Sequence, residues 1–209
     1  MPVQVLQALV ALALLYDRTD FAAALLIGFM ALLRPGELVD PRVADVLLPH
    51  IVLCRPGTFY VVIRSPKMRR LAARREHVLV AEPSVTAFLE TALRGRAPKE
   101  RVFPGGGADL RRVLAGLLLA LGIPTGDTVG LTLASLRAGG ATWLYSETRD
   151  LELVRWRGRW GAPRTLEVYI QEVGALHILS EVEQSVRDRV QRFASAMPAL
   201  IRQAGDGSL

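Results

Sequence analysis

Two apolar stretches near the start of the sequence constrain the fold most strongly. Val3–Leu15 and Phe21–Leu33 each comprise 13 residues without a charged side chain, and the run Tyr16-Asp17-Arg18-Thr19-Asp20 separates them. A helix that spans a bilayer needs about 20 consecutive apolar residues, so neither stretch is long enough. In the first stretch, apolar residues recur at helical spacing, at Leu6, Leu9, Val10 and Ala13. We therefore predict two buried core helices, over about Val3–Tyr16 and Phe21–Leu33, and no membrane partner.

The remaining pattern predicts a mainly α fold with a small antiparallel β-sheet inserted early, an α+β class. Asp20 is expected to cap the second helix, which should end near Arg34 because a following proline disfavours helical geometry. Strands are predicted at Val46–Leu48, Ile51–Leu53, Thr58–Ile63 and His77–Val80, with a basic turn at Arg64–Arg75. Further helices are predicted at Pro83–Arg94, Asp109–Leu121, Leu133–Tyr145, Leu151–Arg157, Pro163–Glu172 and Ile178–Met197, the last one ending before Pro198.

The charge balance favours a polyanionic partner. The formal net charge is +6, and only Lys67 and Lys99 among the 26 basic residues are lysine. Arginine's planar fork suits phosphate, although a GC-rich genome would also replace lysine by arginine. The one cysteine, Cys54, excludes an internal disulfide and a multi-cysteine zinc site, which fits a reducing, intracellular compartment. We expect neither a cofactor nor a metal.

Three basic residues stand in contexts that suit a bound phosphate. Arg34 follows an apolar helix and precedes Glu37 by three residues, and a charge there is costly unless it is paired or faces a ligand. Lys67 lies in the basic turn between two predicted strands. Arg137 precedes two adjacent glycines, each of which costs a helix about 1 kcal/mol. The structural alternatives are an Arg34–Glu37 ion pair, a solvated turn around Lys67, and tight helix packing that leaves Arg137 on the surface.

Two aromatic residues follow these arginines along the chain. Trp160 offers a ring N–H donor, and Tyr169 places a phenol nine positions later on a predicted helix. For each residue taken alone, ordinary packing is the alternative interpretation. The order of the basic and aromatic residues suggests a site that binds one phosphate and carries a nucleophile that attacks it.

Together these residues resemble the catalytic domain of the tyrosine recombinase (phage-integrase) family. The resemblance runs from about Gln4 to Glu172. Leu33-Arg34-Pro35-Gly36-Glu37-Leu38 is similar to the first arginine box of the family, and Arg101-Val102-Phe103-Pro104 to the loop before a helix. Lys67 matches the hairpin lysine, Ser135-Leu136-Arg137 the second arginine box, Trp160 the His/Trp position, and Tyr169 the nucleophile.

The resemblance implies a DNA breaking-rejoining enzyme fold and strand exchange in double-stranded DNA without a cofactor. Tyr169 would form a 3′-phosphotyrosyl link. Arg34 and Arg137 would stabilise the phosphate charge, Lys67 would protonate the leaving 5′-oxygen, and Trp160 would donate a hydrogen bond to a non-bridging oxygen. Glu37 is expected to orient Arg34. The implied roles are DNA recombination and integration within a mobile element, and the implied location is DNA-associated.

The sequence departs from the family in two respects. Ala134 occupies the position where the family's second box usually has histidine, and alanine cannot exchange a proton. We expect residues 1–175 to form the catalytic domain and the family's N-terminal core-binding domain to be absent. Residues 176–209 would form a C-terminal helix and tail that either docks on its own domain or joins a neighbouring protomer in a homo-oligomer on DNA.

Other functions share parts of this pattern. A catalytically weakened integrase remnant would act only as a DNA-binding module, and Ala134 favours this alternative. A type IB topoisomerase would use the same chemistry to relax supercoils. A small helical membrane protein is a further alternative, but charged residues throughout the second half argue against it.

Overall fold

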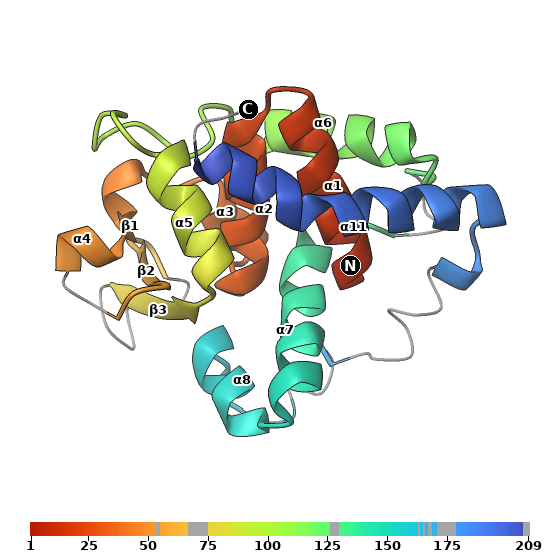
Figure 1. Cartoon of the computed structure of the whole chain (residues 1–209). Coiled ribbons are helices and arrows are strands. Elements are labelled where there is room, and N and C mark those ends of the chain that lie inside the picture. The colour runs from red at the N-terminus through yellow and green to blue at the C-terminus, as the bar shows by residue number, and fades with distance from the viewer. Residues whose placement is uncertain are drawn as a thin grey trace.

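A computed structural model describes residues 1–52, 55–66, 75–125, 130–162, 164, 166, 169–170 and 179–206. A small sheet lies at one side of a mainly helical molecule, which confirms the predicted mainly α class with an antiparallel sheet (Figure 1). The helices are α1 (Val3–Leu15), α2 (Thr19–Met30), α3 (Pro35–Leu38), α4 (Pro49–Val52), α5 (Pro83–Ala92), α6 (Gly107–Leu121), α7 (Ala134–Thr148), α8 (Leu151–Gly158) and α11 (Gln184–Gly205), with a 3-10 turn at Val43–Asp45. The strands are β1 (Val46–Leu47), β2 (Thr58–Ile63) and β3 (Glu76–Ala81).

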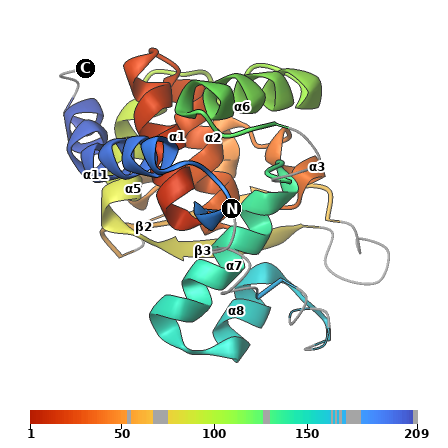
Figure 2. The ribbon, with the colours of Figure 1, turned by 90° about the vertical axis from the view of Figure 1, so that its right-hand side faces the viewer.

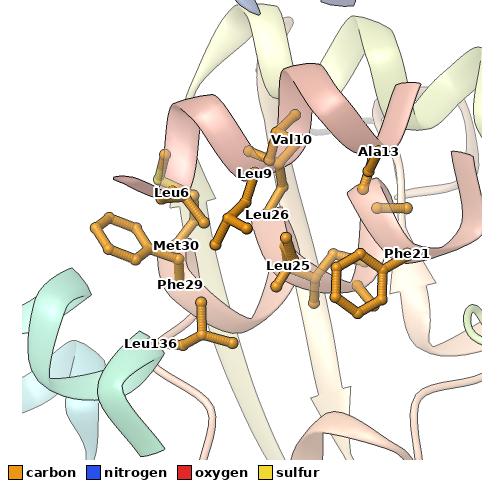
Figure 3. Packing of buried hydrophobic residues seen from close by; sticks show 14 of the residues in the cluster. Leu6, Leu9, Val10, Ala13, Phe21, Leu25, Leu26, Phe29, Met30 and Leu136 are labelled. Carbon is orange, nitrogen blue, oxygen red and sulfur yellow. The ribbon is translucent and has the colours of Figure 1, made fainter. Parts of the chain in front are cut away.

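The two apolar helices α1 and α2 form the centre of the core, as predicted. Their side chains interdigitate, and Leu136 of α7 approaches them from below (Figure 3). A helix that is apolar on all sides needs neighbours on all sides, and α1 packs against α2, α6, α7 and α11. Two expected boundaries of α2 are wrong. Arg18, and not Asp20, is the N-cap, and the helix ends at Met30 because Leu32 adopts a left-handed φ of 51°.

The sheet has the order β1-β2-β3, and both strand pairs are antiparallel. Phe59 pairs with Val80, and Val61 pairs with both Val46 and Val78. The expected strand at Ile51–Leu53 is wrong as far as the structure describes it, because Pro49–Val52 is the short helix α4. Proline suits a first helical turn, and Ile51 and Val52 are exposed, so their β-propensity has no sheet face to cover.

The C-terminal helix α11 crosses α1 and also packs on α5 of its own chain (Figures 1 and 2). It begins at Gln184 and continues through Pro198 to Gly205, so the expected end at Met197 is wrong. Packing explains the continuation, because Ile201 is buried against the core and Thr91 of α5 donates a hydrogen bond to the Gly205 carbonyl. Among the described residues, no helix combines the length and apolar character that a membrane crossing requires.

Helix α7 descends from the core and leads to α8 (Figure 2). Its two glycines permit close approach to α2 and the start of the chain, because a Cβ on Gly139 would lie 2.0 Å from the Met1 carbonyl oxygen. A Cβ on Gly140 would lie 2.2 Å from that of Phe29. A second, smaller hydrophobic cluster forms beyond this crossing, with Leu32, Ala141, Leu144, Val154, Trp160 and Leu166 as its buried members. The candidate site lies where Leu32 packs against α7 and α8.

Candidate functional site

Arg34 and Glu37 form an ion pair across the single turn of α3. Pro35 at the first helical position starts this turn. The Arg34 backbone N–H donates to Glu37 Oε2 at 2.9 Å, and Arg34 Nη1 donates to Oε1 at 2.8 Å. The ion pair weighed from the sequence is therefore present, yet 27% of the Arg34 side chain is exposed. Glu37 fixes one part of the guanidinium and leaves the rest accessible to a ligand.

Arg137 is buried within α7, with 3% of its surface exposed, so the interpretation that placed it on the surface is wrong. Its Nη1 donates to the Leu32 carbonyl, and its Nη2 donates to the Gly158 carbonyl at 2.5 Å. Burial, together with repulsion from Arg159 and Arg34, lowers the pKa of Arg137 to about 10. The group remains a cation at neutral pH, and these two carbonyls hold it in place.

The rings of Trp160 and Tyr169 lie against the Arg137 guanidinium. The Cζ atom of Arg137 is 4.2 Å from the Trp160 ring centroid and 5.7 Å from that of Tyr169. The two ring centroids are 5.1 Å apart at an interplanar angle of 51°. Cation–π attraction of this kind holds a guanidinium and aromatic rings in fixed relative positions. A buried cation, an indole and a phenol therefore meet at one place.

Tyr169 is tied to α7 through its backbone. Thr142 Oγ1 donates to the Tyr169 carbonyl at 3.1 Å, and the Tyr169 N–H donates to Leu166 at 2.8 Å. Tyr169 lies in a turn and is partly buried beside the second cluster. Most of the helix predicted at Pro163–Glu172 lies outside the described residues. The phenol is thus placed by contacts made to α7.

Arg159 belongs to the same cluster, and sequence reasoning missed it. Its Nη2 donates to Glu37 Oε2 at 2.9 Å and to the Leu32 carbonyl at 3.2 Å. Its Nη1 donates to Glu37 Oε1 at 3.2 Å and to Glu76 Oε2 at 3.0 Å. The signal in the sequence is an arginine between Gly158 and Trp160. It was obscured by the neighbouring arginines in Val154-Arg155-Trp156-Arg157.

The buried carboxylate of Glu37 sits between two guanidinium groups. Burial by itself would raise the pKa of Glu37. The hydrogen bonds and charge of Arg159, followed by the backbone N–H and guanidinium of Arg34, hold this pKa below its ordinary value. Glu37 is therefore ionised at neutral pH. Among the described residues of the cluster, the three guanidiniums of Arg34, Arg137 and Arg159 exceed the carboxylates of Glu37 and Glu76 by one positive charge.

The other residues considered from the sequence are Lys67, Ala134 and the histidines. Lys67 lies outside the described residues. Ala134 is exposed at the start of α7, one turn before Arg137. His50 lies on α4, with Nδ1 3.6 Å from Glu90, and His77 is exposed on β3. The described residues contain no group of three or more metal-ligating side chains.

Comparison with known proteins supports the fold. No family model and no curated protein matches the sequence. One similar solved structure is a post-cleavage complex of the XerH site-specific recombinase with palindromic difH substrate, at 16% identity and a TM-score of 0.57. A pre-cleavage complex of XerH with difH substrate is similar at 14% identity and a TM-score of 0.58.

The similarity covers 81% and 87% of this chain but 48% and 52% of the two XerH chains. The fold is that of a tyrosine recombinase catalytic domain. The chain spans about half the length of the recombinases that it matches. At this level of identity the likeness establishes the fold, so the roles of individual residues depend on the geometry described above.

Proposed function

We propose that the chain binds double-stranded DNA and breaks and rejoins it with Tyr169 as the nucleophile. The observation that carries this proposal is the position of Arg137, whose buried cation contacts the rings of both Trp160 and Tyr169. Arg34, partly exposed beside Glu37, adds a second cation. The recombinase fold supports the same function, because both similar XerH structures are complexes with a difH substrate.

The mechanism divides one phosphoryl transfer into two reversible steps. The Tyr169 phenolic oxygen bonds to the scissile phosphorus, and the bond from phosphorus to the 5′-oxygen breaks. This gives a 3′-phosphotyrosyl link, with the phenolic proton passing to water. Lys67 donates a proton to the leaving 5′-oxygen. In the second step, a 5′-hydroxyl of another strand attacks the phosphorus and gives its proton to Lys67. The bond from phosphorus to the Tyr169 oxygen breaks, and the phenolate takes a proton from water. The bond energy is conserved, so no cofactor is needed.

Electrostatic stabilisation comes from the two arginines that the proposal places at the phosphate. The partly exposed Arg34 can donate hydrogen bonds to phosphate oxygens. Arg137 is buried and its two Nη atoms donate to carbonyls, so it contributes mainly its positive charge. Both charges stabilise the additional negative charge of the transition state. The Trp160 indole N–H donates to a non-bridging oxygen. The single positive charge in excess within the cluster would be balanced by the bound phosphodiester. Arg34 to Ala and Arg137 to Ala should therefore both impair DNA cleavage.

Covalent trapping tests the proposal. The protein is incubated with nicked suicide duplexes of varied sequence, and an SDS-resistant protein–DNA adduct is expected. Tyr169→Phe removes the attacking oxygen and should abolish the adduct while leaving DNA binding within about threefold. Tyr16→Phe is the matched control, because Tyr16 is exposed in the turn after α1. An adduct that persists in Tyr169→Phe would show that another residue is the nucleophile.

A binding-only module is the second candidate, and Ala134 favours it. In place of the family's usual histidine, Ala134 cannot take the phenolic proton, so strand cleavage would be slow or lost. Wild-type protein that binds duplexes but forms no adduct on any of them would support this candidate. Relaxation of supercoiled plasmid without joining of two DNA sites would instead indicate a type IB topoisomerase.

The wider assignments are also proposals. Residues 1–175 act as the catalytic domain of an intracellular, DNA-associated recombinase or integrase from a mobile element. Residues 176–209 form its C-terminal segment. In the structure, α11 of this segment docks on α1 of its own chain. A homo-oligomer on DNA would require this helix to contact, or exchange with, a neighbouring protomer.

A further inference from the structure

We infer that Arg159 is a positioning residue that holds both phosphate-binding arginines in their working orientations. The inference rests on the proposed function and adds a residue that the resemblance to the recombinase family does not supply. Arg159 reaches Arg34 through Glu37 and reaches Arg137 through the carbonyl oxygen of Leu32. The guanidinium of Arg159, the residue that follows α8 as its C-cap, thereby connects the two arginine boxes, which lie about a hundred residues apart in the sequence.

The geometry of the four hydrogen bonds requires an arginine. The two Nη atoms bind the two oxygens of Glu37 side by side, while Nη1 also reaches Glu76 and Nη2 also reaches Leu32. A lysine ammonium presents a single nitrogen and cannot occupy both Nη positions. The side chain is 10% exposed, and its Nε has no hydrogen-bond partner among the described residues. The side-chain hydrogen bonds of Arg159 in the described structure therefore all go to Glu37, Glu76 and the Leu32 carbonyl.

The Leu32 carbonyl couples Arg159 to Arg137. Leu32 is buried and has a φ of 51°, a region that non-glycine residues rarely adopt. This backbone conformation places its carbonyl where both Arg137 Nη1 and Arg159 Nη2 donate to it. Contacts from two cations support a turn that is intrinsically unfavourable. Loss of Arg159 would remove one of them and would loosen the acceptor that fixes Arg137.

Glu76 extends the connection to the sheet. It is the first residue of β3 and follows, within ten positions, the segment that contains Lys67. Arg159 Nη1 holds its carboxylate at 3.0 Å. The Arg159 guanidinium thus connects the C-terminus of α8 to the first residue of β3. This strand follows the segment that contains Lys67, the predicted proton donor. A change at Glu76 should act on the reaction through Arg159.

The test compares Arg159→Ala and Arg159→Lys with Arg155→Ala. Arg155 is the control because it lies within α8, one turn before Arg159, and its side chain pairs only with Glu152 among the described residues. Adduct formation on a suicide duplex is followed under conditions where circular dichroism shows each variant folded. We expect both Arg159 variants to slow adduct formation by about 10- to 100-fold, as misplacement of catalytic groups does. DNA affinity should change by less than about threefold, because other phosphate contacts remain.

A double-mutant cycle separates positioning from general stabilisation. Glu76→Gln should slow the wild-type reaction yet have no further effect in Arg159→Ala, since its connection to the site is already lost. Additive effects of the two substitutions would overturn the inference. A wild-type rate of adduct formation in either Arg159→Ala or Arg159→Lys would overturn it as well. A wild type without any adduct would instead contradict the proposed function.

A titration tests the positioning role independently of turnover. The Glu37 carboxyl is followed by NMR in wild type and in Arg159→Ala, and its pKa should rise when Arg159 is removed, because the hydrogen bonds and the charge by which Arg159 lowers this pKa are lost. The other charged groups around it are common to both proteins: Arg34, Arg137, Asp40, Asp45, Arg64 and Glu76. An unchanged Glu37 titration would overturn the inference whether or not the protein cleaves DNA.

Discussion

Gly158 shows how one residue sets the geometry of two site side chains. Its carbonyl oxygen accepts a hydrogen bond from Arg137, and its missing side chain leaves room for the Trp160 ring. A Cβ at this position would lie 1.6 Å from Trp160 Cζ3, a distance that no relaxed structure tolerates. The ring that packs on the Arg137 cation therefore depends on a glycine two residues earlier.

Gly158→Ala should displace Trp160 and destabilise the fold by about 1–3 kcal/mol, the usual cost of overpacking. Its adduct yield should fall as well, because the indole no longer lies beside Arg137. Chemical denaturation measures the first effect and covalent trapping the second. Gly116→Ala is the control on α6, where an added Cβ would meet no described atom within 4 Å. That substitution should stabilise the helix by about 0.5–1 kcal/mol. Equal stability of the two variants would contradict the prediction.

Helix α7 organises the site at the scale of secondary structure. Gly139 and Gly140 bring it against α2, Arg137 lies beside this crossing, and Thr142 holds the backbone of Tyr169. The sequence pattern predicted the helix and offered tight packing at its two glycines as the structural alternative to close approach by a phosphate. It did not predict that Arg137 would be buried. Burial depends on the carbonyls of Leu32 and Gly158, which belong to other parts of the chain.

Helix α11 shows where local signals fail, because it continues through Pro198. A proline inside a helix removes the hydrogen bond to the carbonyl four residues earlier, here that of Ala194, and its ring crowds that carbonyl. Pro198 itself is exposed, while Ala194 and Ile201 on either side are buried against the core. Tertiary packing thus sustains a helix that the sequence pattern ends at Met197.

Pro198→Ala should therefore stabilise the protein by about 1–3 kcal/mol, since it restores an N–H donor within an already packed helix. The midpoint of urea unfolding should rise without a change in slope. Ser195→Ala, an exposed substitution on the same helix, controls for helix propensity and should contribute at most about 0.5 kcal/mol. A Pro198→Ala variant no more stable than Ser195→Ala would show that the packed helix already compensates fully for its proline.

At the scale of the whole molecule, the sequence predicted the elements better than their connections. Periodicity located α1, β2, α6 and α8 to within two residues, because each is defined by its own pattern. The Arg159 bonds to Glu37 and Glu76 join positions that are 122 and 83 residues apart. No local pattern encodes such a contact. The strand predicted at Ile51–Leu53 was wrong for the same reason, because whether a β-prone residue joins a sheet depends on distant strands.

Salt dependence of DNA binding tests the whole charge distribution. With a net charge of +6 and a cationic cluster in the fold, binding should release counterions, and log affinity should fall linearly with log salt concentration. Arg34→Ala and Arg137→Ala should each reduce the magnitude of this slope by about one, because each removes a positive charge that is proposed to neutralise the bound phosphate. Arg112→Ala is the control, because Arg112 is exposed on α6 and paired with Asp109. Fluorescence anisotropy with one labelled duplex from about 50 to 200 mM salt covers the useful range. Unchanged slopes in both site variants would place the DNA backbone elsewhere on the molecule and would contradict the proposed phosphate site.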